Sequence, residues 1–259
     1  MVSSKMFDLS GKVALVTGGN RGIGAAIALG LAEAGAAVAI AARDERKNAE
    51  TLERLKGLAV PAMARRLDLK QRRELRPAFE EVERRLGPVD ILVNNAAYAT
   101  LTGVLDTSEE DWDGVMEVNL NAAVILSRYA AKSMIARGRG GKIINVTSLA
   151  ASFGSAVFPS YAVAKGGLAQ LTRSLAIELA PHNIQVNALA PGWFSTDMTE
   201  WIRTGPEYDW LLKEMVQRTP RGRFGDPEEL KGAAVFLASS ASDHMTGADL
   251  LIDGGFSIR

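Results

Sequence analysis

Short apolar runs alternate with amphipathic stretches along almost the whole chain. The runs are rich in Val, Ile, Leu and Ala, as strands buried on both faces of a parallel sheet are. The stretches between them repeat apolar residues at helical spacing. This alternation predicts an α/β fold, in which a doubly wound parallel sheet carries helices on both faces. The expected strands are 12–19, 36–43, 62–69, 89–97, 140–148, 184–192 and 248–255, and the expected helices are 23–35, 44–55, 71–87, 108–138, 159–183 and 226–239.

The segment 192–218 interrupts the alternation. It is bounded by Gly and Pro and concentrates aromatic residues, among them Trp193, Trp201 and Trp210. Aromatic side chains in an irregular segment need a surface to cover, and we interpret 192–218 as a lid over a substrate. Because the alternation is otherwise continuous, we expect a single domain over 1–259.

Composition narrows the possible functions. Hydrophobic residues make up 47% and charged residues 23% of the chain, as in a globular protein with a sizeable core. Lys plus Arg and Asp plus Glu both number 30, so no excess of positive charge favours a nucleic acid or an anionic membrane. The chain has no Cys and two His, so we expect neither disulfides nor a metal site. No signal-like or membrane-spanning apolar run is present, and we expect a cytoplasmic protein.

A glycine-rich turn separates the first expected strand from the first expected helix. It runs from Thr17 to Gly24 and contains four glycines. Glycine lets a phosphate approach the backbone closely, and the helix that follows offers free N–H groups at its N-terminus. The turn is a candidate dinucleotide cradle, although a βα turn can also use glycine for steric reasons.

The end of the second strand bears on the choice of dinucleotide. Many NAD sites place an acidic side chain here to hold the ribose 2′-hydroxyl, whereas this chain has Ala42 followed by Arg43. Arg43, with Arg21 in the glycine-rich turn, suits a 2′-phosphate. We therefore expect NADP(H) to be preferred, with NAD(H) possible. The alternative is that Arg43 merely opens the charged helix 44–55.

Ser148, Tyr161 and Lys165 form the candidate catalytic group. Tyr161 and Lys165 are four residues apart in an expected helix, so both side chains leave the same face. A neighbouring ammonium lowers the pKa of a phenol and makes it a usable general acid or base. Ser148 ends an expected strand at the carboxyl edge of the sheet, where α/β sheets bind ligands. A Tyr and a Lys four apart are also common on helix surfaces, so context has to decide.

Asparagines stand at two further places. Asn94 and Asn95 follow the apolar run of the fourth strand, where side-chain bonds to the backbone can pin a loop. Asn119 lies inside the expected helix 108–138, where Asn is mildly unfavourable. It indicates either a local backbone bond with a kink, or a water held for chemistry.

The motifs TGGNRGIG, NNAA and Tyr161-xxx-Lys165, with Asn119 and Ser148, resemble those of the short-chain dehydrogenase/reductase family over essentially the whole chain. The resemblance implies a Rossmann-type, seven-stranded parallel sheet, a bound nicotinamide dinucleotide and a homotetramer. It implies that Tyr161 exchanges a proton with the substrate oxygen and that Ser148 hydrogen-bonds this oxygen. It also implies that Lys165 holds the nicotinamide ribose and that Asn119 keeps a water in a proton relay.

The expected cofactor contacts lie in the glycine-rich turn, at strand ends and in the catalytic group. They are Gly18, Asn20, Arg21, Gly22, Ile23, Gly24, Arg43, Asp68, Leu69, Asn95, Ala96, Tyr161, Lys165, Pro191, Gly192, Phe194 and Thr196. Ala97 departs from the family pattern, which has glycine there, and its methyl group would narrow the nicotinamide pocket.

The substrate is a small carbonyl or alcohol in every catalytic interpretation. The chain resembles bacterial gluconate 5-dehydrogenases, through HNIQVNALAPGWFSTDMT and GDPEELKGAAVFLASSASD, and also 3-oxoacyl-carrier-protein reductases. The side chains expected to line the pocket are mostly apolar, and for this reason we expect reduction of a neutral, fairly hydrophobic ketone. A sugar-acid dehydrogenase, a 3-oxoacyl reductase and a non-catalytic nucleotide-binding sensor are the alternatives. The pocket residues are Tyr98, Leu149, Phe153, Phe158, Trp193, Met198 and Trp201.

Overall fold

The computed structural model describes residues 4–258 and contains a seven-stranded sheet in which every paired strand is parallel. The strands are β1 (Val13–Thr17), β2 (Ala37–Ala42), β3 (Ala62–Arg66), β4 (Ile91–Asn94), β5 (Gly141–Val146), β6 (Ile184–Pro191) and β7 (Asp249–Ile252). Their order is β3-β2-β1-β4-β5-β6-β7, so β1 and β4 are neighbours. The chain therefore leaves these two strands in opposite directions, which opens a crevice at their carboxyl ends. The Rossmann-type prediction is confirmed.

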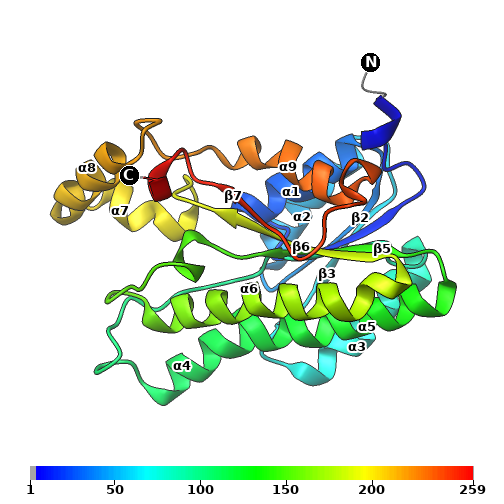
Figure 1. Ribbon diagram of the computed structural model, residues 1–259, viewed down its shortest axis with the longest axis horizontal. Coiled ribbons are helices and arrows are strands. Elements are labelled where there is room, and N and C mark those ends of the chain that lie inside the picture. The colour runs from blue at the N-terminus through cyan, green and yellow to red at the C-terminus, as the bar shows by residue number, and fades with distance from the viewer. Residues whose placement is uncertain (1–3, 259) are drawn as a thin grey trace.

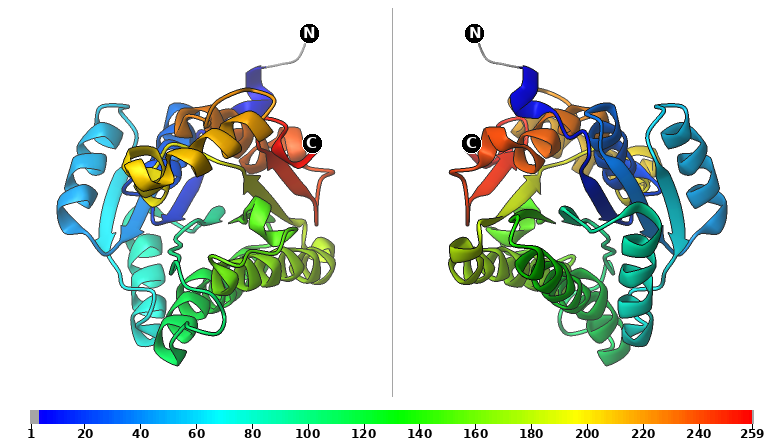
Figure 2. Two further views of the ribbon diagram at one scale, coloured as in Figure 1. Left: turned by 90° about the vertical axis from the view of Figure 1, so that its left-hand side faces the viewer. Right: turned by 90° about the vertical axis from the view of Figure 1, so that its right-hand side faces the viewer.

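Helices cover both faces of the sheet, as Figures 1 and 2 show. They are α1 (Gly22–Glu33), α2 (Glu45–Lys56), α3 (Arg72–Leu86), α4 (Glu109–Met116), α5 (Ala122–Arg137), α6 (Pro159–Leu179), α7 (Glu200–Thr204), α8 (Asp209–Arg218) and α9 (Lys231–Ala238). One core, which includes Ile27 and Leu237, lies between the sheet and α1, α2 and α9. The other, which includes Phe79 and Leu126, lies between the sheet and α3, α5 and α6. Within residues 4–258, no helix combines the length and apolar character needed to cross a bilayer.

Several expected elements are shorter or interrupted. The helix expected over 108–138 is divided by a π-helical turn, Glu117–Asn121, between α4 and α5. The helix expected over 226–239 begins as the 3-10 turn Pro227–Leu230, which Asp226 caps through the backbone N–H of Glu228. β4 and β5 end before the predicted strand ends, because Asn95 after β4 bonds to the turn that follows β1 and Ser148 after β5 caps a 3-10 turn.

The segment 192–218 folds into α7 and α8 with two short 3-10 turns, beside the C-terminal residues (Figure 1). Trp193 packs against Phe224 and Phe256, and Trp201 packs against Tyr208, whereas Trp210 is 64% exposed. The Trp193 ring lies 5.8 Å from that of Phe224, and the Trp201 ring meets Tyr208 edge-on at 4.8 Å. The segment thus has a small core of its own.

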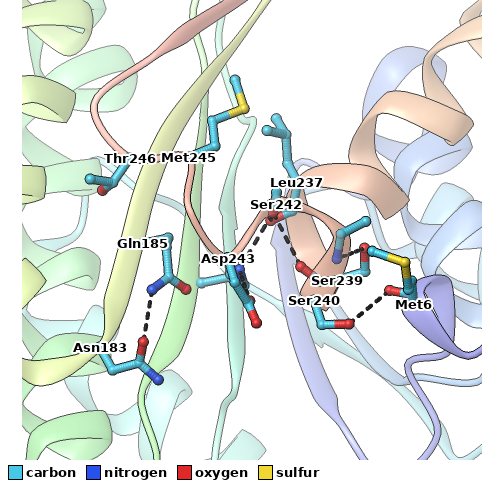
Figure 3. A network of polar contacts seen from close by, with 12 residues as sticks. Met6, Asn183, Gln185, Leu237, Ser239, Ser240, Ser242, Asp243, Met245 and Thr246 are labelled. Carbon is cyan, nitrogen blue, oxygen red and sulfur yellow. Dashed lines mark hydrogen bonds and ion pairs between the residues drawn. The ribbon is translucent and has the colours of Figure 1, made fainter.

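Hydrogen bonds also join neighbouring segments at the amino-terminal ends of the strands, opposite the carboxyl ends where the crevice opens (Figure 3). The Ser242 hydroxyl donates to the carbonyls of Leu237 and Ser239 at 3.1 Å, and the Ser240 hydroxyl donates to the carbonyl of Met6 at 3.1 Å. These bonds join the end of α9 to the N-terminal 3-10 turn. With this edge closed by structural contacts, the carboxyl edge is the place for a binding site.

We predict that Gly24→Ala destabilises the fold. A methyl group on Gly24 would overlap the carbonyl oxygen of Gly18 and the side-chain amide of Asn95, so the start of α1 would have to move. Overpacking of this kind costs roughly 1 to 3 kcal/mol in the free energy of unfolding.

Gly232→Ala is the matched control for Gly24→Ala, because Gly232 also lies in a helix but no described atom stands within 4 Å of an added methyl group. Alanine there should be neutral or stabilising by up to about 1 kcal/mol. Both values come from denaturant unfolding. Equal stability of the two variants would contradict the packing of this turn.

Candidate active site

The hydroxyl, phenol and ammonium of the candidate group lie where β5 and α6 meet. Ser148 stands two residues beyond the end of β5 and accepts a hydrogen bond from the backbone N–H of Ala150 at 3.1 Å, which caps a 3-10 turn. Tyr161 lies in the first turn of α6, where Phe158 packs edge-on against its ring at 6.0 Å. The placement of Ser148 at the carboxyl edge is as predicted.

Lys165 is almost completely buried, with 1% of its surface exposed. Its Nζ donates to the carbonyl oxygen of Val146 at 2.6 Å and lies 5.6 Å from the centre of the Tyr161 ring. The bond ties α6 to the last residue of β5 and fixes where the ammonium stands. Because burial disfavours the charged form, it lowers the pKa of Lys165 to about 7.

The predicted effect of Lys165 on Tyr161 is wrong. Burial raises the pKa of Tyr161, and the group that opposes this rise is Ser148, through a hydrogen bond, rather than Lys165. The physical reason is that burial disfavours the charged phenolate, and this effect outweighs the hydrogen bond with Ser148. Tyr161 therefore keeps its proton at neutral pH, which suits a proton donor.

Asn119 lies in the π-helical turn between α4 and α5. Its side chain is buried, its amide donates to the carbonyl of Tyr98 at 2.9 Å, and its carbonyl accepts from the Tyr98 N–H at 3.1 Å. The predicted backbone bond is present, but it reaches the loop after β4 instead of the helix itself, and the helix is interrupted by a π-helical turn. Glu117, in the same turn, receives two hydrogen bonds from Arg72, which lower its pKa. π-Helical turns are frequent at functional sites.

The glycine-rich turn is held by β4. The Asn95 amide donates to the carbonyls of Thr17 and Gly18 at 2.9 and 3.2 Å, while the Thr17 hydroxyl accepts from the N–H groups of Asn95 and Ala96. Asn94 instead bonds to Ser127 and Asn145 in the core. The predicted loop-pinning role is confirmed for Asn95 and wrong for Asn94, whose amide meets side chains of the core instead of loop backbone.

The start of α1 fits an anionic group. Gly18 and Gly22 have φ of +63° and +50°, which only glycine adopts readily, and Arg21 leaves the first N–H groups of α1 without a side-chain cap. Thr196 lies against Gly22, because a methyl group there would stand 3.3 Å from the Thr196 side chain. A helix N-terminus of this kind, flanked by cations, suits the pyrophosphate of a dinucleotide.

Three cations gather near the end of β2. Arg43 is exposed and has no ion-pair or hydrogen-bond partner among the described residues. Arg21 and Lys47 both contact Asp197, at 3.0 and 2.8 Å. Sequence reasoning missed Lys47 and Asp197. A signal for Lys47 was available, because a cation in the first turn of a helix opposes the helix dipole and so needs a reason.

The other expected cofactor residues lie around the same edge. Asp68 and Leu69 follow β3, and Pro191 and Gly192 end β6. Phe194 is 4% exposed, its side chain lies in the core that includes α1, and its carbonyl accepts from the Thr199 hydroxyl at 2.6 Å. Asn20 turns away and donates to the carbonyl of Asp44 at 3.2 Å, and Ile23 is partly buried against the same core as Phe194.

The expected pocket residues fall into separate groups. Leu149, Trp193 and Trp201 belong to the small core of the segment 192–218, whereas Phe153 and Met198 are exposed by 41% and 43%. Tyr98 points its ring toward Lys70, whose Nζ lies 5.3 Å from the ring centre. Its hydroxyl is buried beside Gly114 and has no hydrogen-bond partner among the described atoms. Phe158 is the pocket residue that touches Tyr161.

Comparison with known proteins gives the family. The family model described as enoyl-(acyl carrier protein) reductase matches residues 18–257. The 2-dehydro-3-deoxy-D-gluconate 5-dehydrogenase of Escherichia coli (strain K12) is 40% identical over 253 residues, which cover 98% of both chains. The chain belongs to the short-chain dehydrogenase/reductase family. Its members catalyse oxidation and reduction at CH–OH groups, and the chain is an oxidoreductase of this class.

Solved structures of this family agree with the fold. A putative 2-deoxy-D-gluconate 3-dehydrogenase from Agrobacterium tumefaciens with bound NADP has a TM-score of 0.90 and 42% identity, over 98% of this chain and 99% of that one. A gluconate 5-dehydrogenase from Burkholderia cenocepacia in complex with NADP and tartrate has a TM-score of 0.92 and 38% identity, over 99% of each chain. Both short-chain dehydrogenase/reductase structures contain NADP.

The lowered pKa of Lys165 predicts how the stability of the fold depends on pH. Below pH 7 the folded and unfolded states both carry the ammonium, and the folded state bears the full cost of burying it. From about 7 to the ordinary value of 10.5 the folded state loses this proton first, so stability increases as the pH rises. The stability of Lys165→Met relative to the parent should therefore fall by roughly 2 to 4 kcal/mol between about pH 6 and about pH 9.5.

Denaturant unfolding at several pH values measures this change. Lys132→Met, at an exposed position of α5, is the control and should follow the pH dependence of the parent. If the difference in stability between Lys165→Met and the parent is the same at the lowest and the highest pH, Lys165 is not held in a poorly solvated place.

Proposed function

We propose that the chain is an NADP(H)-dependent oxidoreductase that interconverts a ketone and a secondary alcohol on a sugar acid. The observation that carries the chemistry is the convergence of Ser148, Tyr161 and Lys165 at the carboxyl end of β5. The substrate class rests on the relatives, which bear the names of gluconate-type dehydrogenases over nearly the full length of both chains. Among the alternatives set out from the sequence, this is the sugar-acid dehydrogenase.

Tyr161 would give its proton to the substrate oxygen in reduction and take it back in oxidation. Its raised pKa supports the first role, because the phenol is protonated at neutral pH. Ser148 would hydrogen-bond the same oxygen, and Lys165 would hold the nicotinamide ribose and return a proton to Tyr161. Asn119 would keep a water that links Lys165 to solvent. The nicotinamide, when bound, supplies or accepts the hydride.

The dinucleotide would lie across the crevice between β1 and β4. The glycine-rich turn and the start of α1 would hold its pyrophosphate, and Thr196 would close over it from the other side. Arg43 and Arg21 would face the 2′-phosphate of the adenosine ribose. The unpartnered guanidinium of Arg43 supports NADP(H) over NAD(H).

The site offers few cations for the carboxylate of a sugar acid. Arg203 of α7 is the nearest candidate, and its guanidinium is exposed and donates to the carbonyl of Thr196 at 3.1 Å. A neutral, hydrophobic ketone is the second candidate, because Phe153 and Met198 are apolar and 41% and 43% exposed near the site. In either case the segment 192–218 would act as the lid over the substrate.

The chain would assemble as a homotetramer in the cytoplasm. The exposed apolar residues Val163 and Ile177 on α6 and Leu251 on β7 support the assembly, since they are 50%, 79% and 43% exposed. The expectation otherwise comes from the family. A cytoplasmic site agrees with a chain that has no Cys.

A substrate panel tests the function. The protein should oxidise D-gluconate with NADP⁺ or reduce a keto-gluconate with NADPH, followed by nicotinamide absorbance. A value of kcat/KM at least about tenfold above that for a neutral cyclic ketone or a 3-oxoacyl thioester is expected, which corresponds to ~1.4 kcal/mol of transition-state binding. A panel in which the neutral ketone is the best substrate favours the second candidate.

Tyr161→Phe should lower kcat/KM by roughly 10²- to 10⁴-fold, because it removes the proton donor and keeps the ring. Cofactor affinity, measured by fluorescence, should change little. Tyr129→Phe is the matched control, since Tyr129 of α5 packs on Phe79 of α3 and not against the candidate catalytic group. Activity of Tyr161→Phe within about threefold of the parent would refute the assigned role.

Arg43→Ala should reduce the preference for NADPH over NADH by roughly one to two powers of ten, the value of a charge-assisted bond of about 1.5 to 3 kcal/mol. Adding Ala42→Asp should reverse the preference, since the carboxylate repels the phosphate and accepts from the ribose hydroxyls. The ratio of kcat/KM for the two cofactors measures both changes. If Arg43 only opens the helix, the ratio stays as in the parent.

A further inference from the structure

Asp197 joins three parts of the chain that are distant in sequence. Its Oδ2 atom accepts from Nη1 of Arg21 at 3.0 Å and from Nζ of Lys47 at 2.8 Å. Arg21 immediately precedes α1, Lys47 lies in the first turn of α2, and Asp197 begins a 3-10 turn after β6. One carboxylate oxygen thus sits between two cations at the place where the adenosine end of a dinucleotide would lie.

We propose that Arg21 and Lys47 form part of the 2′-phosphate site and that Asp197 is a built-in competitor for it. On this view Lys47 and Asp197, together with Arg43, set the preference for NADP(H). The inference rests on the proposed function and adds two specificity-determining residues to it, of opposite effect: Lys47 favours the phosphate and Asp197 opposes it.

The charges favour displacement of Asp197 by a phosphate. Asp197 brings one negative charge, whereas a phosphate monoester brings ≈ −1.5 to −2 and three acceptor oxygens. The side chains of Arg21 and Asp197 are 54% and 49% exposed, so water screens their ion pair and a stronger anion can replace it. Lys47 is only 25% exposed, and its ammonium is held close to the site.

The surroundings of the two cations support a ligand role. Asp44 lies between Arg43 and the start of α2, but its carboxylate caps the helix by accepting from the N–H of Lys47 at 3.0 Å. In the interactions described for residues 4–258, Asp197 is the only acidic group paired with Arg21 or Lys47. When a phosphate takes its place, both ammonium and guanidinium become available, beside the unpartnered Arg43.

The competing explanation is that Asp197 is a permanent strap. In that case Arg21 and Lys47 only fix the segment after β6 onto α1 and α2, and Arg43 alone faces the 2′-phosphate. The two explanations predict different effects when the Asp197 carboxylate is removed. If Asp197 is a competitor, its removal strengthens phosphate binding. If Asp197 is a strap, its removal leaves phosphate binding unchanged or weakens it.

Calorimetric binding of 2′,5′-ADP and 5′-AMP separates them without catalysis, because these nucleotides differ only in the 2′-phosphate. The parent should bind 2′,5′-ADP more tightly. Asp197→Asn should tighten 2′,5′-ADP binding by roughly 3- to 10-fold and leave 5′-AMP unchanged, the lower part of the range for a charge-assisted bond at a half-exposed site. Lys47→Ala should weaken 2′,5′-ADP binding by a similar factor.

Two controls match the charge changes. Asp209→Asn removes a carboxylate from the same segment, where its partner is Lys213 of the same helix, and Lys56→Ala removes a cation from the last turn of α2, where its partner is Glu53. Neither should alter the ratio of the two affinities by more than about twofold. Thermal unfolding of all variants confirms that they are folded.

An Asp197→Asn protein that binds 2′,5′-ADP no better than the parent overturns the competitor role. A Lys47→Ala protein with the parent's ratio of affinities overturns the role of Lys47. Both outcomes leave the NADP(H) preference intact. A parent that does not distinguish 2′,5′-ADP from 5′-AMP instead contradicts the proposed cofactor preference, and the inference falls with it.

Discussion

The hydrogen bonds between the ends of β1 and β4 determine where everything else in the site can stand. The hydroxyl of Thr17 accepts from the backbone beyond β4, and the amide of Asn95 donates to the backbone beyond β1. This reciprocal pairing closes the sheet where the chain leaves the two strands in opposite directions. It also holds the glycine-rich turn so close that Gly24 has no room for a methyl group. Without it, neither the start of α1 nor the loop after β4 would have a fixed position.

The same loop connects the nucleotide side of the crevice to the chemical side. Asn119 clamps the backbone of Tyr98 from the π-helical turn, and Lys165 clamps the carbonyl of Val146 from α6. Each is a buried polar group whose partner is backbone, in the loop after β4 for Asn119 and at the end of β5 for Lys165, so breaking either bond leaves an unsatisfied polar group in the interior. Burial then moves the two titrating groups of the site in opposite directions, with the pKa of Tyr161 raised and that of Lys165 lowered to about 7.

The sequence predicts most of the fold and of the catalytic group, because these features depend on residues that are close together along the chain. Hydrophobic alternation locates the strands, Ser148 follows from its place after an apolar run, and Asn95 after β4 bonds to loop backbone as its side-chain chemistry indicates. The remaining features depend on contacts between distant segments. The pairing of Asp197 with Arg21 and Lys47 spans 176 and 150 residues, and no local pattern predicts it. The pKa of Tyr161 depends on burial, which spacing along a helix does not give. The direction of the Tyr98 ring likewise depends on Lys70 and Gly114.

The central claim is that Ser148, Tyr161 and Lys165 direct a hydride to the carbonyl carbon of a sugar acid and a proton to its oxygen. Reduction of a keto-gluconate with NADPH that carries two deuterium atoms at C4 of the nicotinamide, followed by NMR of the product, tests it most directly. The account predicts one deuterium on the carbon that carries the new hydroxyl, with one equivalent of NADP⁺ formed. An unlabelled alcohol, or no alcohol formed with NADPH consumed, would contradict it.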